Sequence, residues 1–284
     1  MAQRWTLQII YVDDLHVVVV GPDRFKTLWL LLAAYEVAGT PFNYAKFKGG
    51  HEAEFVGYFL SYSDHRAGIS ERRCRWVLDW IASVERDRWM VLGRNLAEFV
   101  GRMTFVGRLV GWVRPFLAPL YAWKAFLNRG TTARAPEAVY LSLCYLRDHF
   151  EEPNQVTFRV ILDAGTDNKS APQAQKKGHS TKWPLFGVLM QMVSELAKNN
   201  KLLRLAWRPR EQNQEADDLT NLQFDKFDVR LRKMVCLADV PLAVVHDMSK
   251  VRQDFLDRCA ELKPLKLAEG RASKKQKMAD KTPW

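Results

Sequence analysis

Two adjacent carboxylates near the start of the chain are the sharpest chemical signal in the sequence. They belong to the run Tyr11-Val12-Asp13-Asp14, which joins two apolar, β-branched stretches at 6–12 and 15–20. This pattern predicts a β-hairpin with both carboxylates at its tip. Paired carboxylates offer hard oxygen ligands to Mg²⁺ or Mn²⁺, and two such ions can activate a hydroxyl and stabilise a leaving pyrophosphate. An Asp-Asp pair is also a common solvated turn, so its context has to decide.

A second set of carboxylates lies in the C-terminal half of the chain. Asp167 belongs to the run Gly165-Thr166-Asp167-Asn168, which follows an apolar stretch at 157–162 that predicts a strand. Asp217 lies in a predicted short helix at 213–220. An isolated Asp is more often a helix cap or a surface residue than a metal ligand, so neither position is diagnostic by itself.

The elements that must position these residues follow from the apolar periodicity. Helices are expected to begin at candidate start signals such as Pro22 and Ser70, and to end at stop signals such as Gly39. The expected helices span 22–39, 70–84, 94–113, 121–128, 136–150, 183–199 and 213–220; the expected strands span 6–12, 15–20, 42–48, 54–61, 157–162 and 202–207; residues 130–135 are expected to form a linker. The strand–helix–strand–helix order beyond residue 155 indicates a second, α/β unit, so the fold class is α+β or α/β.

Positive charge is concentrated in the predicted helical region. The whole chain has 43 Lys and Arg against 32 Asp and Glu, a net charge of +11. Residues 72–134 contain twelve basic and four acidic residues, a net charge of +8, interleaved with five tryptophans. Arginines among aromatics suit a phosphate backbone and stacked bases, but the same composition fits a solvated basic face over a core that holds the tryptophans. The candidate nucleic-acid-binding residues are Arg94, Arg102, Arg108, Arg114 and Lys124.

The sequence also argues against several classes of protein. The longest apolar runs, such as 28–35, fall short of the roughly 18–20 residues that span a bilayer, and the first residues lack a secretory signal pattern. The four cysteines show no CxxC spacing, which suits a reducing compartment, so we expect an intracellular protein, nuclear or cytoplasmic. P-loop, GxGxxG and HExxH motifs are absent. The basic segment 262–284 is expected to be a disordered tail, either solubilising or nuclear-targeting.

The order of the N-terminal motifs resembles the palm of reverse transcriptases. The hairpin around Tyr11-Val12-Asp13-Asp14 is similar to motif C of that family. The runs at 40–50 and 55–60 are similar to motif D, which carries a lysine, and to motif E, which grips the primer end. The resemblance implies that Asp13 and Asp14 are catalytic metal ligands, with Asp13 the more direct one. It also implies that Lys46 or Lys48 protonates the pyrophosphate, and the sequence leaves that choice open.

The C-terminal unit resembles ribonuclease H domains. Gly165-Thr166-Asp167-Asn168 is similar to the Thr-Asp-Asn at a strand end of that fold, and the run at 207–221 is similar to its last catalytic helix. The resemblance implies that Asp167 and Asp217 are catalytic metal ligands, and that Asp218 is a solvated neighbour. Over residues 8–220, the motifs most resemble retroelement polymerases of the tyrosine-recombinase (DIRS-like) group.

This resemblance implies a domain plan and a function. Residues 1–69 would form a partial palm, 70–150 a helical thumb or connection, 155–240 a partial ribonuclease H-like unit and 262–284 the tail. The implied activity is RNA-directed DNA polymerase with a ribonuclease H-like segment, using Mg²⁺ or Mn²⁺, nucleic acid and, in a complete enzyme, dNTPs. Motif A and the early ribonuclease H acids have no counterpart, so we expect a truncated chain that is inactive alone. The alternative is a non-catalytic, nucleic-acid-binding retroelement remnant, and the oligomeric state stays open.

Overall fold

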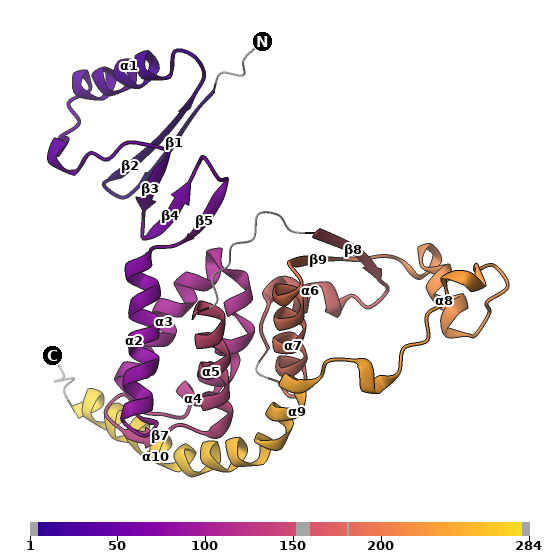
Figure 1. The fold of residues 1–284 in the computed structure, drawn as a ribbon. Coiled ribbons are helices and arrows are strands. Elements are labelled where there is room, and N and C mark those ends of the chain that lie inside the picture. Colours follow the sequence, from indigo (N-terminus) through magenta and orange to yellow (C-terminus); the bar gives the residue numbers. More distant parts are fainter. Residues whose placement is uncertain (1–4, 152–159, 181, 280–284) are drawn as a thin grey trace. The chain divides into compact units, whose positions relative to one another are not determined.

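The two β-branched stretches near the start of the chain pair as the hairpin that their pattern predicts (Figure 1). The computed structural model describes residues 5–151, 160–180 and 182–279. Strand β1 (Trp5–Tyr11) runs antiparallel to β2 (Asp14–Val20), and the last pair in the register joins Tyr11 to Asp14. The turn therefore consists of Val12 and Asp13, and Val12 adopts a left-handed φ of 59°. Helix α1 (Arg24–Val37) follows, as expected from the helical pattern at 22–39.

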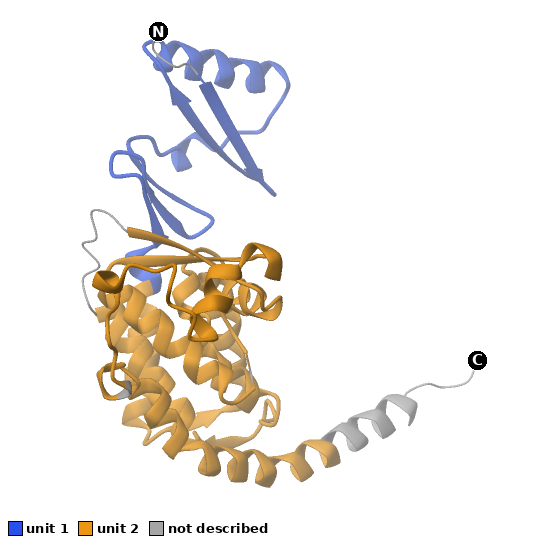
Figure 2. Cartoon of the chain, turned by 90° about the vertical axis from the view of Figure 1, so that its right-hand side faces the viewer, with its two compact units in different colours: residues 1–73 blue, residues 74–284 orange. Residues whose placement is uncertain are grey.

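The chain divides into two compact units, residues 1–73 and 74–284, which Figure 2 colours separately. It is a mixed α+β protein with small, separate sheets. The first unit buries little apolar surface, because one helix and two short sheets cannot enclose a core. Helix α1 has no buried residue, and its Phe25, Trp29 and Leu30 side chains are all more than 60% exposed.

Two expected strands of the first unit have a different structure. The strand expected at 42–48 is wrong: a 3₁₀ turn, η1 (Tyr44–Lys46), brings Phe47 against Phe42 and Tyr44, with ring centroids 5.4 and 5.1 Å away. The single strand expected at 54–61 is instead a hairpin, because Gly57 takes a left-handed φ of 77° and reverses the chain. The resulting sheet contains β3 (Glu52–Phe55), β4 (Tyr58–Ser61) and β5 (Arg66–Ile69), all antiparallel.

A histidine joins the hairpin to this three-stranded sheet within the first unit. The ring of His16 on β2 lies 4.8 Å from that of Phe55, centroid to centroid, and its Nε2 hydrogen-bonds the Tyr62 hydroxyl. Burial lowers the pKa of the His16 imidazole. This contact therefore packs β2 against the three-stranded sheet two residues after Asp14.

The second unit has a helical core. Its helices are α2 (Glu71–Arg86), α3 (Gly93–Leu109), α4 (Ala118–Lys124) and α5 (Glu137–Glu151), with short 3₁₀ turns η2 (Gly111–Val113) and η3 (Pro115–Leu117) between α3 and α4. The predicted apolar face of α3 is confirmed, since Leu96, Phe99 and Met103 are fully buried. Helix α3 ends at Leu109 rather than at the expected residue 113. Helix α4 begins at Ala118, beside Pro119, rather than at the expected residue 121. The linker expected at 130–135 is wrong: it contains β7 (Thr132–Arg134), paired with β6 (Met90–Leu92).

The expected α/β elements follow the helical core in the same unit. They are β8 (Val160–Thr166), α7 (Leu185–Lys198), β9 (Lys201–Trp207) and α8 (Gln214–Thr220). Two further elements were not predicted: helix α6 (Ser170–Lys177) and the 3₁₀ turn η4 (Arg210–Gln212). Strands β8 and β9 pair in parallel, from Val160 opposite Lys201 to Thr166 opposite Trp207. Strand β8 runs four residues past its expected end at 162, because backbone pairing with β9 continues to Thr166. The expected residues 157–159 of this strand lie outside the described residues.

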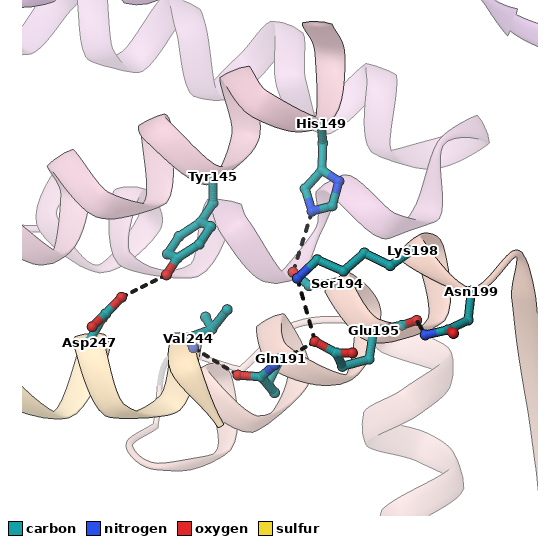
Figure 3. A network of polar contacts seen from close by, with 9 residues as sticks. All are labelled: Tyr145, His149, Gln191, Ser194, Glu195, Lys198, Asn199, Val244 and Asp247. Carbon is teal, nitrogen blue, oxygen red and sulfur yellow. Dashed lines mark hydrogen bonds and ion pairs between the residues drawn. The ribbon is translucent and has the colours of Figure 1, made fainter. Parts of the chain in front are cut away.

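The C-terminal segment returns to the helical core. After the 3₁₀ turns η5 (Val229–Leu231) and η6 (Leu237–Asp239) come α9 (Ala243–Lys250) and α10 (Arg252–Ala279). Figure 3 shows the polar contacts: the Gln191 carboxamide on α7 accepts from the Val244 backbone N–H at 2.8 Å, and the Tyr145 hydroxyl on α5 donates to Asp247. The disordered tail expected at 262–284 is wrong up to Ala279, because its Lys, Leu, Ala and Glu residues are strong helix formers. Among the described residues, no helix has the length and apolar character needed to cross a membrane.

Candidate nucleic-acid and metal sites

The hairpin carboxylates lie at the predicted tip. Asp13 occupies the turn and Asp14 begins β2, so only Asp13 belongs to the loop itself. Both side chains are exposed. A solvated carboxylate pair leaves its oxygen lone pairs available to a hard cation, and the same exposure fits a simple polar turn.

The two candidate lysines follow α1 in the first unit. Lys46 ends the η1 turn, Lys48 lies in the segment after it, and both are exposed. Within the described part of the chain, neither lysine forms an ion pair with Asp13 or Asp14. The structure therefore does not choose between Lys46 and Lys48.

The second candidate site lies at the carboxyl ends of β8 and β9. Because these strands are parallel, the segments that leave them start at the same edge. Two hydrogen bonds hold that edge: the Trp207 Nε1–H donates to the Asp167 carbonyl at 3.0 Å, and the Arg208 N–H donates to the Thr166 carbonyl at 2.8 Å. Lys169 also lies over the Trp207 ring, 5.0 Å from its centroid. Asp167, one of the two predicted acidic ligands, therefore directly follows the paired end of β8.

An arginine pairs with one of the two predicted ligands of this edge. Arg210 Nε donates to Oδ2 of Asp217 on α8 at 3.0 Å. The Asp217 carboxylate, and then that of Asp167, raise the pKa of the Arg210 guanidinium. Arg210 is not among the predicted site residues, although it lies three residues after β9, in the run at 207–221 that resembles the last catalytic helix of ribonuclease H.

The neighbouring Asp218 has a structural role. The expectation that it is a solvated neighbour is wrong, because its side chain is buried, with 4% of the residue exposed. Gln214 Nε2 donates to it at 2.8 Å and Lys226 Nζ at 2.9 Å. These two contacts lower the pKa of the Asp218 carboxyl. On a helix, consecutive residues point in different directions, so Asp217 faces the strand edge while Asp218 anchors the loop after α8.

The donor chemistry of both pairs suits a hard divalent cation. Mg²⁺ is commonly held by one or two carboxylates together with water and substrate phosphate oxygens, which Asp13 with Asp14, or Asp167 with Asp217, can supply. Within residues 5–151, 160–180 and 182–279, no group of three or more His, Cys, Asp or Glu side chains is arranged to hold a metal ion. Each site therefore offers at most a pair of protein carboxylates in the described residues.

The five candidate nucleic-acid-binding residues have different environments. Arg102 forms an i,i+4 ion pair with Glu98 at 2.6 Å and lies over the Trp76 ring, 4.2 Å from its centroid. Arg114 Nε donates to the Gly107 carbonyl at 2.6 Å, so it is largely engaged by backbone. The remaining three, Arg94, Arg108 and Lys124, are exposed or half-buried on α3 and α4. The structure brings Arg108 and Arg114 to one cavity.

The tryptophans of the basic region serve the core and its edge. Trp123 is fully buried, Trp80 stacks on Phe99 with centroids 3.8 Å apart, and Trp89 meets Tyr140 edge-on. Trp76 and Trp112 are half-buried. These environments support the interpretation that the tryptophans belong to the core and its edge. The arginines and lysines remain the candidate contacts to nucleic acid.

Comparisons of the chain with protein-family models, curated proteins and solved structures found no match in any of the three.

Proposed function

We propose that this chain is the polymerase–ribonuclease H-type polypeptide of a retroelement and that it acts on RNA–DNA hybrids. The observation that carries the proposal is the position of Asp167 directly after β8, at the carboxyl end of a parallel strand pair, with Asp217 on helix α8 after β9. This is the edge at which the resemblance to ribonuclease H expects two metal-binding acids. The motif order of the first unit and the net charge of +11 support the same proposal.

The proposed chemistry is phosphoryl transfer assisted by divalent ions. Mg²⁺ or Mn²⁺, when bound, would supply charge stabilisation at the reacting phosphate and lower the pKa of a coordinated water or hydroxyl. Asp13 and Asp14 would hold the ion at the polymerase site, and Asp167 and Asp217 at the ribonuclease site. Lys46 or Lys48 would donate a proton to the leaving pyrophosphate. The basic side chains of α3 and α4 would hold the nucleic acid backbone.

A second candidate function is nucleic-acid binding without catalysis. It is favoured by the Arg210 guanidinium, which already neutralises Asp217 at 3.0 Å and so occupies an oxygen that a metal ion would use. In this case the basic helices bind the hybrid, while the carboxylates stabilise the strand edge through Arg210. The two functions share the binding step and differ in whether phosphodiester bonds are made or broken.

One experiment tests the proposal. Purified protein is assayed in Mg²⁺ and in Mn²⁺ for cleavage of the RNA strand of a hybrid and for primer extension on an RNA template. Any cleavage should be lost in Asp217→Asn, and any extension should be lost in Asp13→Asn with Asp14→Asn. Asp225→Asn, an exposed carboxylate outside both pairs, is the matched control and should leave both activities unchanged.

The same preparation is tested for binding to a labelled hybrid as the salt concentration rises. Salt-sensitive binding without turnover would support the second candidate function in place of the first. Turnover that survives the site variants would point to a contaminating nuclease or polymerase. Absence of binding at low salt would overturn both functions, because phosphate contacts are strongest there.

A further inference from the structure

A cavity in the second unit brings together residues from three elements that are far apart in the sequence. Its volume is about 540 Å³, within the usual range for ligand sites. Helices α3, α4 and α6 and the segments next to them line it. Arg108 on α3 and Gln173 on α6 both line it although 65 positions separate them, so no local sequence pattern predicts the cavity.

The charge of this lining is positive. Arg108, Arg114, Lys176 and Lys177 carry full charges, and no acidic residue is among the described residues that line the cavity. The described part of the chain contains no ion pair of Arg108, Lys176 or Lys177 with an acidic side chain. Three cations that converge without a protein counter-charge favour an anionic ligand.

Arg114 holds the two sides of the cavity together. Its Nε donates to the Gly107 carbonyl of α3 at 2.6 Å, and its Nη1 donates to the Lys176 and Lys177 carbonyls at 3.3 and 3.4 Å. These last two carbonyls belong to the C-terminal turn of α6, where unpaired carbonyls favour a cation. Arg114 therefore fixes the backbone that carries both lysines, opposite Arg108.

An aromatic wall completes the cavity. The Tyr121 hydroxyl hydrogen-bonds Thr104 Oγ1, which fixes the ring of Tyr121 on α4. The His179 ring lies 6.2 Å away, centroid to centroid. A flat aromatic surface beside lysine and arginine side chains is an arrangement that binds a sugar or a base together with its phosphate.

From this geometry we propose that the cavity binds a backbone phosphate of a nucleic-acid strand, through Arg108, Lys176 and Lys177, with Arg114 as the positioning residue. The inference rests on the proposed function in one respect, that the chain binds an RNA–DNA hybrid. It goes beyond that function by assigning the contact to a cavity between the thumb-like helices and the ribonuclease H-like elements, rather than to the whole basic face.

The test measures binding of a fluorescein-labelled 20-base-pair RNA–DNA hybrid by anisotropy over a range of salt concentrations. The triple variant Arg108→Ala, Lys176→Ala, Lys177→Ala is compared with a control triple that removes the same charges outside the cavity, Arg129→Ala, Lys233→Ala, Lys250→Ala. All six side chains are exposed, so both triples should keep the wild-type circular dichroism spectrum and Tm. A labelled mononucleotide provides a second probe.

We expect the cavity triple to weaken hybrid binding about tenfold or more and to reduce the slope of log K against log salt by about 1, since one phosphate contact contributes roughly 0.9. The control triple should change affinity less than about threefold, as expected for a general loss of charge. If the wild type binds the hybrid and the two triple variants weaken that binding equally, the cavity proposal is overturned and the proposed function stands. A cavity triple that weakens only mononucleotide binding would also overturn it, in favour of a free-nucleotide site. Absence of hybrid binding by the wild type would overturn both proposals.

Discussion

Arg210 Nε lies 3.0 Å from Oδ2 of Asp217, and this pair joins the loop after β9 to helix α8. The guanidinium also interacts with the more distant Asp167 carboxylate. A cation therefore already pairs with one of the two acids for which the ribonuclease H resemblance implies a metal ion. The first prediction follows from this competition.

Arg210→Gln should increase the affinity of the Asp167–Asp217 pair for Mn²⁺ by about fivefold. The reason is that a positive charge beside the Asp217 carboxylate opposes the binding of a second cation to the same oxygens. Mn²⁺ binding is measured by electron paramagnetic resonance, with Arg204→Gln on β9 as the control of equal charge change. Equal affinities in wild type and Arg210→Gln, or unchanged binding after Asp217→Asn, would contradict the prediction.

Tyr145 should make the stability of the second unit sensitive to alkaline pH. Burial, and then the hydrogen bond to Asp247, raise the pKa of Tyr145 from 10.0 to about 12. Because the folded protein keeps this proton while the unfolded chain loses it near pH 10, the stabilisation is fully present below pH 10. It is lost as the pH rises towards 12.

Urea unfolding of the wild type and of Tyr145→Phe at pH 8–11 measures this effect. At pH 8 the variant should be less stable by about 1 kcal/mol, because it loses a partly exposed hydrogen bond. The difference should shrink as the pH rises, and Asp247→Asn should show a smaller pH dependence than the wild type. Parallel pH profiles for wild type and Tyr145→Phe would refute the assignment.

Two glycines of α3 should respond in opposite ways to alanine. A Cβ at Gly93 would lie 1.9 Å from the Asn128 carbonyl oxygen, a backbone atom that cannot move aside, whereas a Cβ at Gly101 would have no heavy-atom neighbour within 4 Å. Gly93→Ala should therefore destabilise the protein by about 1–3 kcal/mol, and Gly101→Ala should stabilise it by about 0.5–1 kcal/mol. Thermal unfolding of the two single variants is the measurement. A destabilised Gly101→Ala together with a neutral Gly93→Ala would show that the α3–Asn128 contact is misplaced.

Hydrogen exchange should separate the two units. Amides of α3 and α5 are protected by a core in which Phe99, Leu143 and Leu146 are fully buried, so they should exchange only on global unfolding of that unit. Amides of α1, which has no buried residue, should exchange orders of magnitude faster. Mass spectrometry after timed deuteration measures both sets in one sample. Similar protection in α1 and α3 would show that a further surface covers α1.

The sequence by itself determined most of the local structure. Two apolar, β-branched stretches around Asp13 and Asp14 identified the β1–β2 hairpin. Helical periodicity identified α2, α3, α5 and α7, because these helices each bury one face. Local sequence patterns predicted the wrong secondary structure where pairing with another strand or a tight turn determined it. The residues expected to be a linker became β7 because β6 offers a partner, and the strand expected around Tyr44 became a 3₁₀ turn because three aromatic rings pack together.

The candidate sites likewise combine residues identified from the sequence with contacts that only the structure shows. Asp13, Asp14, Asp167 and Asp217 were identified from residue type and motif order, which are properties of short segments. Only the tertiary structure paired Arg210 with Asp217, buried Asp218 against Lys226, and brought Lys176 and Lys177 to the same cavity as Arg108. The last relationship depends on the packing of α6 near α3. The Arg114 contacts that hold this cavity together join residues 62 and 63 positions apart, so no local pattern in the sequence encodes them.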